Sequence, residues 1–61
     1  MLFTTGGNEV TVGTINLPRF TYGIIIGSGS KDGSMIAIDT VLNIYAAFRN
    51  NGVWTCRKYT V

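Results

Sequence analysis

Few side chains in this sequence could carry out catalysis. The chain has no histidine, one cysteine and three carboxylates, Glu9, Asp32 and Asp39. A serine or cysteine nucleophile needs a positioned base, and only two lysines and these carboxylates could supply one. Asp32 lies in a glycine-rich stretch and Asp39 at the end of a predicted strand, where aspartate is typical of turns rather than of a glycosidase pair. We therefore expect no catalytic residues and no enzymatic activity.

Metal and cofactor sites are also disfavoured. One thiol without any histidine gives no ligand set for a structural metal ion. The thiol, Cys56, alternates with Trp54 in a predicted strand, where a lone cysteine usually behaves as a small buried hydrophobe. Residues 27–33, Gly-Ser-Gly-Ser-Lys-Asp-Gly, have the composition of a phosphate-binding loop, but such a loop opens a helix and here a strand-like run follows. We expect neither metal nor cofactor.

The side chains that could bind a ligand gather in one predicted hairpin. Tyr45 and Arg49 lie in its first strand, and Trp54, Arg57 and Tyr59 lie in its second. Aromatic rings and guanidinium groups on a sheet face can stack on sugars or bases and donate to hydroxyls or phosphates. The same residues could instead form cross-strand pairs that only stabilise the hairpin. Both interpretations are compatible with the sequence.

The elements that would position this cluster are strands. Even the longest stretch without glycine or proline is rich in β-branched and aromatic residues rather than strong helix formers. Asn51-Gly52 between two such runs is a strong hairpin signal. Turn chemistry divides the chain into five strand-like runs, at 9–16, 20–27, 34–40, 42–49 and 53–61. The prediction is an all-β fold, a small antiparallel sheet or curled barrel of about five short strands.

Three runs carry further expectations. Gly13 suggests a bulge in a weak edge strand, and residues 1–13 are expected to form an N-terminal arm with that strand ahead of a β module at 14–61. In Ile24-Ile25-Ile26 the middle side chain must face away from the other two, so we expect the core to cover one face and another subunit the other. The run at 42–49 predicts a half-buried strand, with Leu42, Ile44, Ala46 and Phe48 on one side.

The size of the chain predicts a partner. A domain of about 60 residues buries only roughly 60% of the surface of its unfolded chain. With disulfide and metal excluded, subunit association remains as a source of stability, and 46% hydrophobic residues with a mean hydropathy of +0.28 support it. A net charge of +2 is weak evidence for a nucleic-acid partner. No apolar run approaches the roughly 20 residues of a membrane helix, so we expect no membrane insertion.

An ordered series of motifs points to a family. Its parts are Tyr-Gly-Ile-Ile-Ile at 22–26, Met-Ile-Ala-Ile-Asp at 35–39, Asn-Ile-Tyr at 43–45, and the segment 49–58 with Asn-Gly, Trp and Arg-Lys. This series resembles the C-terminal knob modules of phage tail fibres and pyocin-like tail fibres over about residues 14–61. Three positions depart from the family pattern. Met35 replaces a common Gln, Arg49 lies two residues later than the usual arginine, and Cys56 stands near the second Trp.

The resemblance implies a trimeric module at the tip of a tail fibre or tailspike. It implies a virion tail location, a longer parent fibre or spike chain, and a role in trimer registration, in host-surface recognition, or in both. Together with the hairpin cluster, it leads us to expect attachment to a bacterial surface polysaccharide through Tyr45, Arg49, Trp54, Arg57 and Tyr59. Two alternatives remain open at this stage. One is a small barrel that binds single-stranded nucleic acid on aromatic platforms, which the low charge disfavours. The other is a purely structural oligomerisation cap.

Overall fold

A computed structural model describes residues 1–27, 29 and 31–61, so Ser28 and Ser30 of the glycine-rich loop lie outside the described residues. The described residues contain strands and no helix, and therefore no helix that could cross a membrane. The strands are β1 (Leu2–Thr4), β2 (Val10–Val12), β3 (Ile15–Leu17), β4 (Tyr22–Ile26), β5 (Gly33–Ile38), β6 (Ile44–Asn50) and β7 (Val53–Tyr59).

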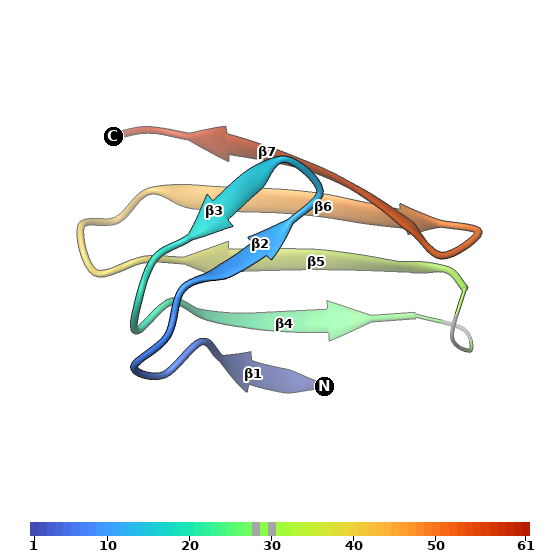
Figure 1. Ribbon diagram of the computed structural model, residues 1–61, viewed down its shortest axis with the longest axis horizontal. Coiled ribbons are helices and arrows are strands. Elements are labelled where there is room, and N and C mark those ends of the chain that lie inside the picture. Colours follow the sequence, from blue (N-terminus) through green and yellow to red (C-terminus); the bar gives the residue numbers. More distant parts are fainter. Residues whose placement is uncertain (28, 30) are drawn as a thin grey trace.

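The strands form two layers (Figure 1). One layer is a five-stranded sheet in the order β1-β4-β5-β6-β7, with every neighbouring pair antiparallel. The other is the β2–β3 hairpin, which lies across one face of that sheet. We call the covered face the inner face and the opposite one the outer face. The predicted all-β antiparallel architecture is confirmed, but the sheet is open and does not close into a barrel.

The β6–β7 hairpin fixes the register of the longest strands. Its two-residue loop is Asn51-Gly52, with φ angles of +52° and +85°. Positive φ at both loop positions is typical of a type I′ turn, which Asn-Gly favours because its twist matches that of the strands. Asn50 consequently pairs with Val53 and Arg49 with Trp54. The hairpin predicted from this dipeptide is confirmed.

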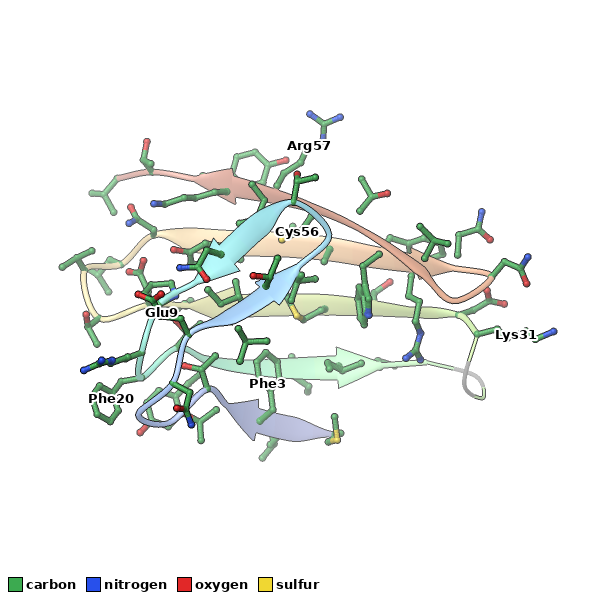
Figure 2. The ribbon with its side chains drawn as sticks, viewed as in Figure 1. Phe3, Glu9, Phe20, Lys31, Cys56 and Arg57 are labelled. Atoms are coloured by element: carbon green, nitrogen blue, oxygen red, sulfur yellow. The ribbon has the colours of Figure 1, made fainter. Side chains whose placement is uncertain are left out.

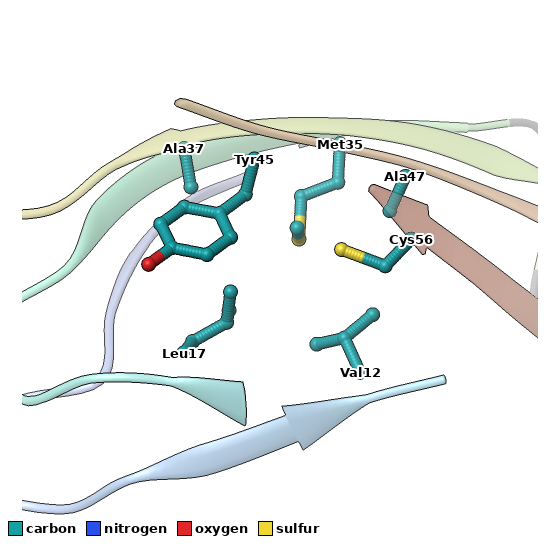
Figure 3. Close-up of a cluster of buried hydrophobic side chains, with 7 residues drawn as sticks. All are labelled: Val12, Leu17, Met35, Ala37, Tyr45, Ala47 and Cys56. Atoms are coloured by element: carbon teal, nitrogen blue, oxygen red, sulfur yellow. The ribbon is translucent and has the colours of Figure 1, made fainter. Parts of the chain in front are cut away.

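The core lies between the inner face and the hairpin (Figure 3). Tyr45 and Leu17 are its largest fully buried apolar side chains, and they come from opposite layers. Small side chains on the middle strands let the hairpin approach the sheet closely. Within the sheet, Gly23 leaves room for the Phe3 ring of the neighbouring strand β1, because a Cβ there would lie 2.7 Å from that ring. The buried apolar residues are Val12, Leu17, Met35, Ala37, Tyr45, Ala47 and Cys56.

The N-terminal part differs from the prediction. The run at 9–16 is not one bulged edge strand but two strands, β2 and β3, because Gly13 at φ +62° occupies the turn between them. The segment expected to be an arm contributes β1, which pairs with β4 along the sheet edge. The predicted boundary between residues 13 and 14 falls inside the β2–β3 turn. The described residues thus form seven strands rather than about five.

β6 is half-buried, as predicted, and the structure shows which of its two sides faces the core. Tyr45 and Ala47 are buried, whereas Ile44 and Phe48 are exposed on the outer face. Alternation separates the two sides of a strand, but the position of the β2–β3 hairpin decides which side is buried. Ile25 does face away from Ile24 and Ile26, as predicted, and it packs against the core.

Candidate functional site

The five side chains predicted to share one ligand site lie on two faces of the sheet. Tyr45, Arg49 and Trp54 are on the inner face, and Arg57 and Tyr59 are on the outer face. The Asn51-Gly52 turn sets this division, because it pairs Arg49 with Trp54 and places Arg57 opposite Ala46. Residues paired across an antiparallel ladder share a face. The predicted single site is therefore wrong as a constellation.

Tyr45 belongs to the core and cannot contact a ligand in this fold. Its side chain is 0% exposed, and its hydroxyl donates to a carboxylate oxygen of Asp39 at 2.8 Å. Burial and the neighbouring carboxylate raise the pKa of Tyr45 to about 12. The Lys58 ammonium lies over its ring, 5.9 Å from the ring centroid. Tyr45 thus joins the core to the β5–β6 turn.

Asp39 organises that turn. Its carboxylate accepts from the backbone N–H groups of Val41 and Asn43 at 2.9 and 3.0 Å, from the Asn43 side chain, and from Tyr45. Burial opposes ionisation, but these donors prevail and lower the pKa of Asp39 from 3.8 to about 2. This agrees with the turn role predicted for Asp39. The turn also places Leu42 at a φ of +70°, in the left-handed region that bulky residues rarely occupy.

Arg49 and Trp54 are the predicted pair that the structure does bring together. The Arg49 guanidinium carbon lies 5.2 Å from the centroid of the Trp54 ring, a cation–π distance. Gly33 completes the same cross-strand row, and a Cβ there would lie 3.4 Å from an Arg49 nitrogen. Nη2 of Arg49 donates to the carbonyl oxygens of Gly29 and Asp32. The pair therefore ties the 27–33 loop to the end of the β6–β7 hairpin.

Arg57 and Tyr59 form a different arrangement with Phe48, which the sequence analysis had not singled out as a ligand contact. The three side chains line a shallow hollow of about 280 Å³ on the outer face, whose floor includes Ala46. Phe48 and Tyr59 are each about half exposed. Figure 2 shows Arg57 projecting from β7 at the sheet edge. Two aromatic rings with one guanidinium group match the chemistry predicted for the hairpin, at a different set of residues.

The outer face extends well beyond Ile24 and Ile26, where the sequence had predicted an apolar side turned away from the core. Register places its side chains in cross-strand rows, of which one is Leu2, Ile24, Ile36, Ala46 and Arg57, and the next is Thr4, Tyr22, Ile38, Ile44 and Tyr59. The aliphatic members of these rows are exposed although no described part of the chain covers them. The exposed outer-face aliphatics are Leu2, Ile24, Ile26, Ile36, Ile38 and Ile44.

The outer face is comparable in size to the largest apolar patches of soluble monomers. The molecule measures 30 × 19 × 16 Å, and Figure 1 views it along the shortest axis, so the face has a flat area of about 570 Å². A typical soluble monomer exposes at most about 300–600 Å² of contiguous apolar surface, and a standard interface buries about 800 Å² per partner. Side-chain relief makes the accessible area larger than the flat one. By flat area the face lies at the upper end of the largest apolar patches of soluble monomers and below one side of a standard interface.

The remaining candidates for chemistry are Cys56 and Asp32. Cys56 is buried, as predicted, and burial raises the pKa of its thiol. Within the part of the chain that the structure describes, no three His, Cys, Asp or Glu residues are grouped to hold a metal ion. Asp32 accepts a hydrogen bond from the backbone of Asn51, beside the Asn-Gly turn.

Parity from the turn would have divided the predicted site correctly. Across a two-residue Asn51-Gly52 loop, residues of the two strands share a face when their separation along the chain is an odd number. Arg49 and Trp54 meet this condition, whereas Arg49 and Arg57 do not. The sequence pattern that indicates an apolar outer face is weaker. Ile24, Ile26, Ile36 and Ile38 alternate with other apolar residues, a pattern of strands covered on both sides.

Comparisons with known proteins give no family for this chain: no family model, curated protein or solved structure matches it.

Proposed function

We propose that this chain is an assembly module that forms a homo-oligomer by burying the outer face of its five-stranded sheet. The observation that carries the proposal is a group of exposed isoleucines on neighbouring strands of that face. Its members form the cross-strand pairs Ile24–Ile36 and Ile38–Ile44 and are not scattered over the surface. Burying apolar surface contributes about 25 cal/mol per Å², so several hundred Å² give a large driving force for association.

The resemblance to tail-fibre knob modules gives this assembly a setting. We propose a trimer at the tip of a phage tail fibre or tailspike, attached to a longer parent chain and acting at the bacterial cell surface. The dimensions of the sheet are compatible with three copies. Four strands, β1, β4, β5 and β6, at about 4.8 Å spacing span roughly 14 Å, and three faces of that width would enclose a prism narrow enough for isoleucine side chains to fill and leave β7 outside it.

For attachment to a surface glycan we propose the hollow lined by Phe48, Arg57 and Tyr59. It lies over β6 and β7, at the edge of the outer face, so a ligand could reach it while the aliphatic part is buried. Aromatic rings stack on the apolar face of a sugar, and a guanidinium group donates to its hydroxyl or carboxylate oxygens. Tyr45 is excluded from this role by its burial.

Two variants of equal charge test the assembly part. Ile36→Lys places a cation in the middle of the outer face, whereas Val41→Lys places one on the β5–β6 turn, where Val41 is also exposed. Light scattering should report a monomer for Ile36→Lys and the unaltered mass for Val41→Lys. An unchanged mass for Ile36→Lys would remove the outer face from the proposal.

A second pair tests attachment. Tyr59→Ala should abolish binding of the module to host cells or to a glycan array, whereas Lys58→Ala, its neighbour on the inner face, should not. If both variants bind as the unaltered chain does, the module has no glycan site in this hollow. If the unaltered oligomer binds no cell or glycan at all, the purely structural cap becomes the better account.

A further inference from the structure

The inner face has a cleft that the assembly proposal does not use. It lies between the β2–β3 hairpin, β1 and the middle of the sheet, and it has a volume of about 300 Å³. Its walls are mainly apolar and include Phe3, Val12, Ile25, Met35 and Trp54. Phe3 projects toward the hairpin side of the sheet (Figure 2). Mainly apolar walls of this size are typical of small-molecule sites, which add a few polar groups that orient the ligand.

Arg49 supplies such a polar group at one end of the cleft. It lines an adjoining hollow of about 420 Å³, and the two spaces share Met1 and Ile25 as walls. Trp54 also connects the two spaces. It lines the cleft, and the centroid of its ring lies 5.2 Å from the Arg49 guanidinium carbon. A ligand could therefore fill the apolar cleft and reach the guanidinium group at once.

The charge of Arg49 has no counter-charge within the described residues. Its Nε is buried and has no hydrogen-bond partner there. Its Nη2 donates to two carbonyl oxygens at 3.4 and 3.3 Å, distances at the weak end of the range for N–H donors. The carboxylates of Asp32 and Asp39 accept hydrogen bonds elsewhere, from Asn51 and from the β5–β6 turn. A partly buried cation in this situation is costly until an anion pairs with it.

We propose that the cleft and Arg49 together bind a monocarboxylate with a short apolar chain, of the fatty-acid type. The chain fills the space between Phe3, Met35 and Trp54, and the carboxylate accepts from the guanidinium group of Arg49. A carboxylate is the anion that the planar donor fork of arginine matches best in a narrow site. The mainly apolar walls exclude a sugar or a nucleotide as the occupant. This site is independent of the outer face and of the proposed assembly.

The test uses octanoate, hexanoate, acetate and octanol as probes of the full chain. Trp54 is the only tryptophan, so its fluorescence reports binding in the cleft. Octanoate should bind about tenfold more tightly than hexanoate, because two methylene groups add to the buried surface. It should bind at least tenfold more tightly than octanol, which lacks the charge. In ¹H–¹⁵N spectra the Nε–H signal of Arg49 should shift with octanoate, and that of Arg57 should not.

Arg49→Gln should remove the preference for octanoate over octanol, and Arg57→Gln on the outer face should preserve it. If Arg49→Gln does not fold, the probe series and the Nε–H signals of the unaltered chain decide the question. Equal affinity for octanol and octanoate would overturn the proposal, as would equal affinity for acetate and octanoate. A shift confined to the Arg57 signal, or a preference retained in Arg49→Gln, would overturn it as well.

Discussion

Met35 and Ile36 are neighbours in β5 that face opposite sides of the sheet, so they offer a matched test of which side is the core. Met35 is 5% exposed and packs in the buried cluster, whereas Ile36 is 54% exposed on the outer face. Truncating a buried methionine to alanine costs about 2–5 kcal/mol. Full burial of an isoleucine stabilises by about 1.5–3 kcal/mol, so truncating the half-exposed Ile36 should cost the isolated chain about 1 kcal/mol.

The two variants should respond differently to protein concentration. Urea unfolding followed by circular dichroism in dilute solution should show the larger loss for Met35→Ala. In concentrated solution the loss for Ile36→Ala should grow, because that variant also weakens association. Partner binding adds about 2.7 kcal/mol when the partner is at a hundred times its Kd. The loss for Met35→Ala should change much less.

Equal losses for the two variants in dilute solution would contradict the assignment of inner and outer faces. A loss for Ile36→Ala that does not depend on concentration would contradict the association of outer faces. The measurement separates these outcomes because the first concerns the free energy of unfolding of one chain, and the second concerns the free energy of association.

Three further predictions concern the interior. Acid should destabilise the fold as pH falls from about 5 toward 2. The pKa of Asp39 is about 2 in the folded chain, below its ordinary value of 3.8. The ionised carboxylate therefore stabilises the fold above pH 3.8, and this stabilisation is lost as Asp39 becomes protonated. Urea titrations from pH 7 to pH 2 should show this loss in the unaltered chain and a smaller loss in Asp39→Asn. If the free energy of unfolding falls equally with pH in both proteins, Asp39 is not the cause. Gly23→Ala should lower stability by about 1–3 kcal/mol, since the new Cβ would lie 2.5 Å from the Ile36 carbonyl oxygen; a melting temperature equal to that of the unaltered chain would show that the strands yield freely. Cys56 should react with a thiol reagent only at the rate of unfolding, since it is buried and its thiol pKa is raised, and rapid labelling under native conditions would be the contrary result.

The hairpins show which parts of the fold local sequence determines. Asn51-Gly52 predicted the β6–β7 turn because its two positions tolerate positive φ, and the alternation in β5 separated Met35 from Ile36. Local signals could not show which of those two sides is buried, because both are apolar. That choice depends on where the β2–β3 hairpin packs, which is a long-range contact. The hairpin itself was missed because Gly13 fits a bulge as well as a turn.

The candidate site shows the same limit in the chemistry. Arg49 and Trp54 were predicted as ligand contacts and do lie together, because a two-residue turn pairs them directly. Tyr45 was predicted with them, but its hydroxyl has a partner in Asp39, six residues earlier, and the ring fills the core. An exposed and a buried tyrosine look the same in a strand pattern. The structure distinguishes them through the packing of the second layer.

The central claim is that the outer face holds copies of the chain together. Sedimentation equilibrium of the unaltered chain, over a range of concentrations, tests it most directly. A chain of 6.6 kDa that forms the proposed trimer should reach a mass of about 20 kDa as concentration rises. A mass that stays at 6.6 kDa up to the highest concentration would contradict the account.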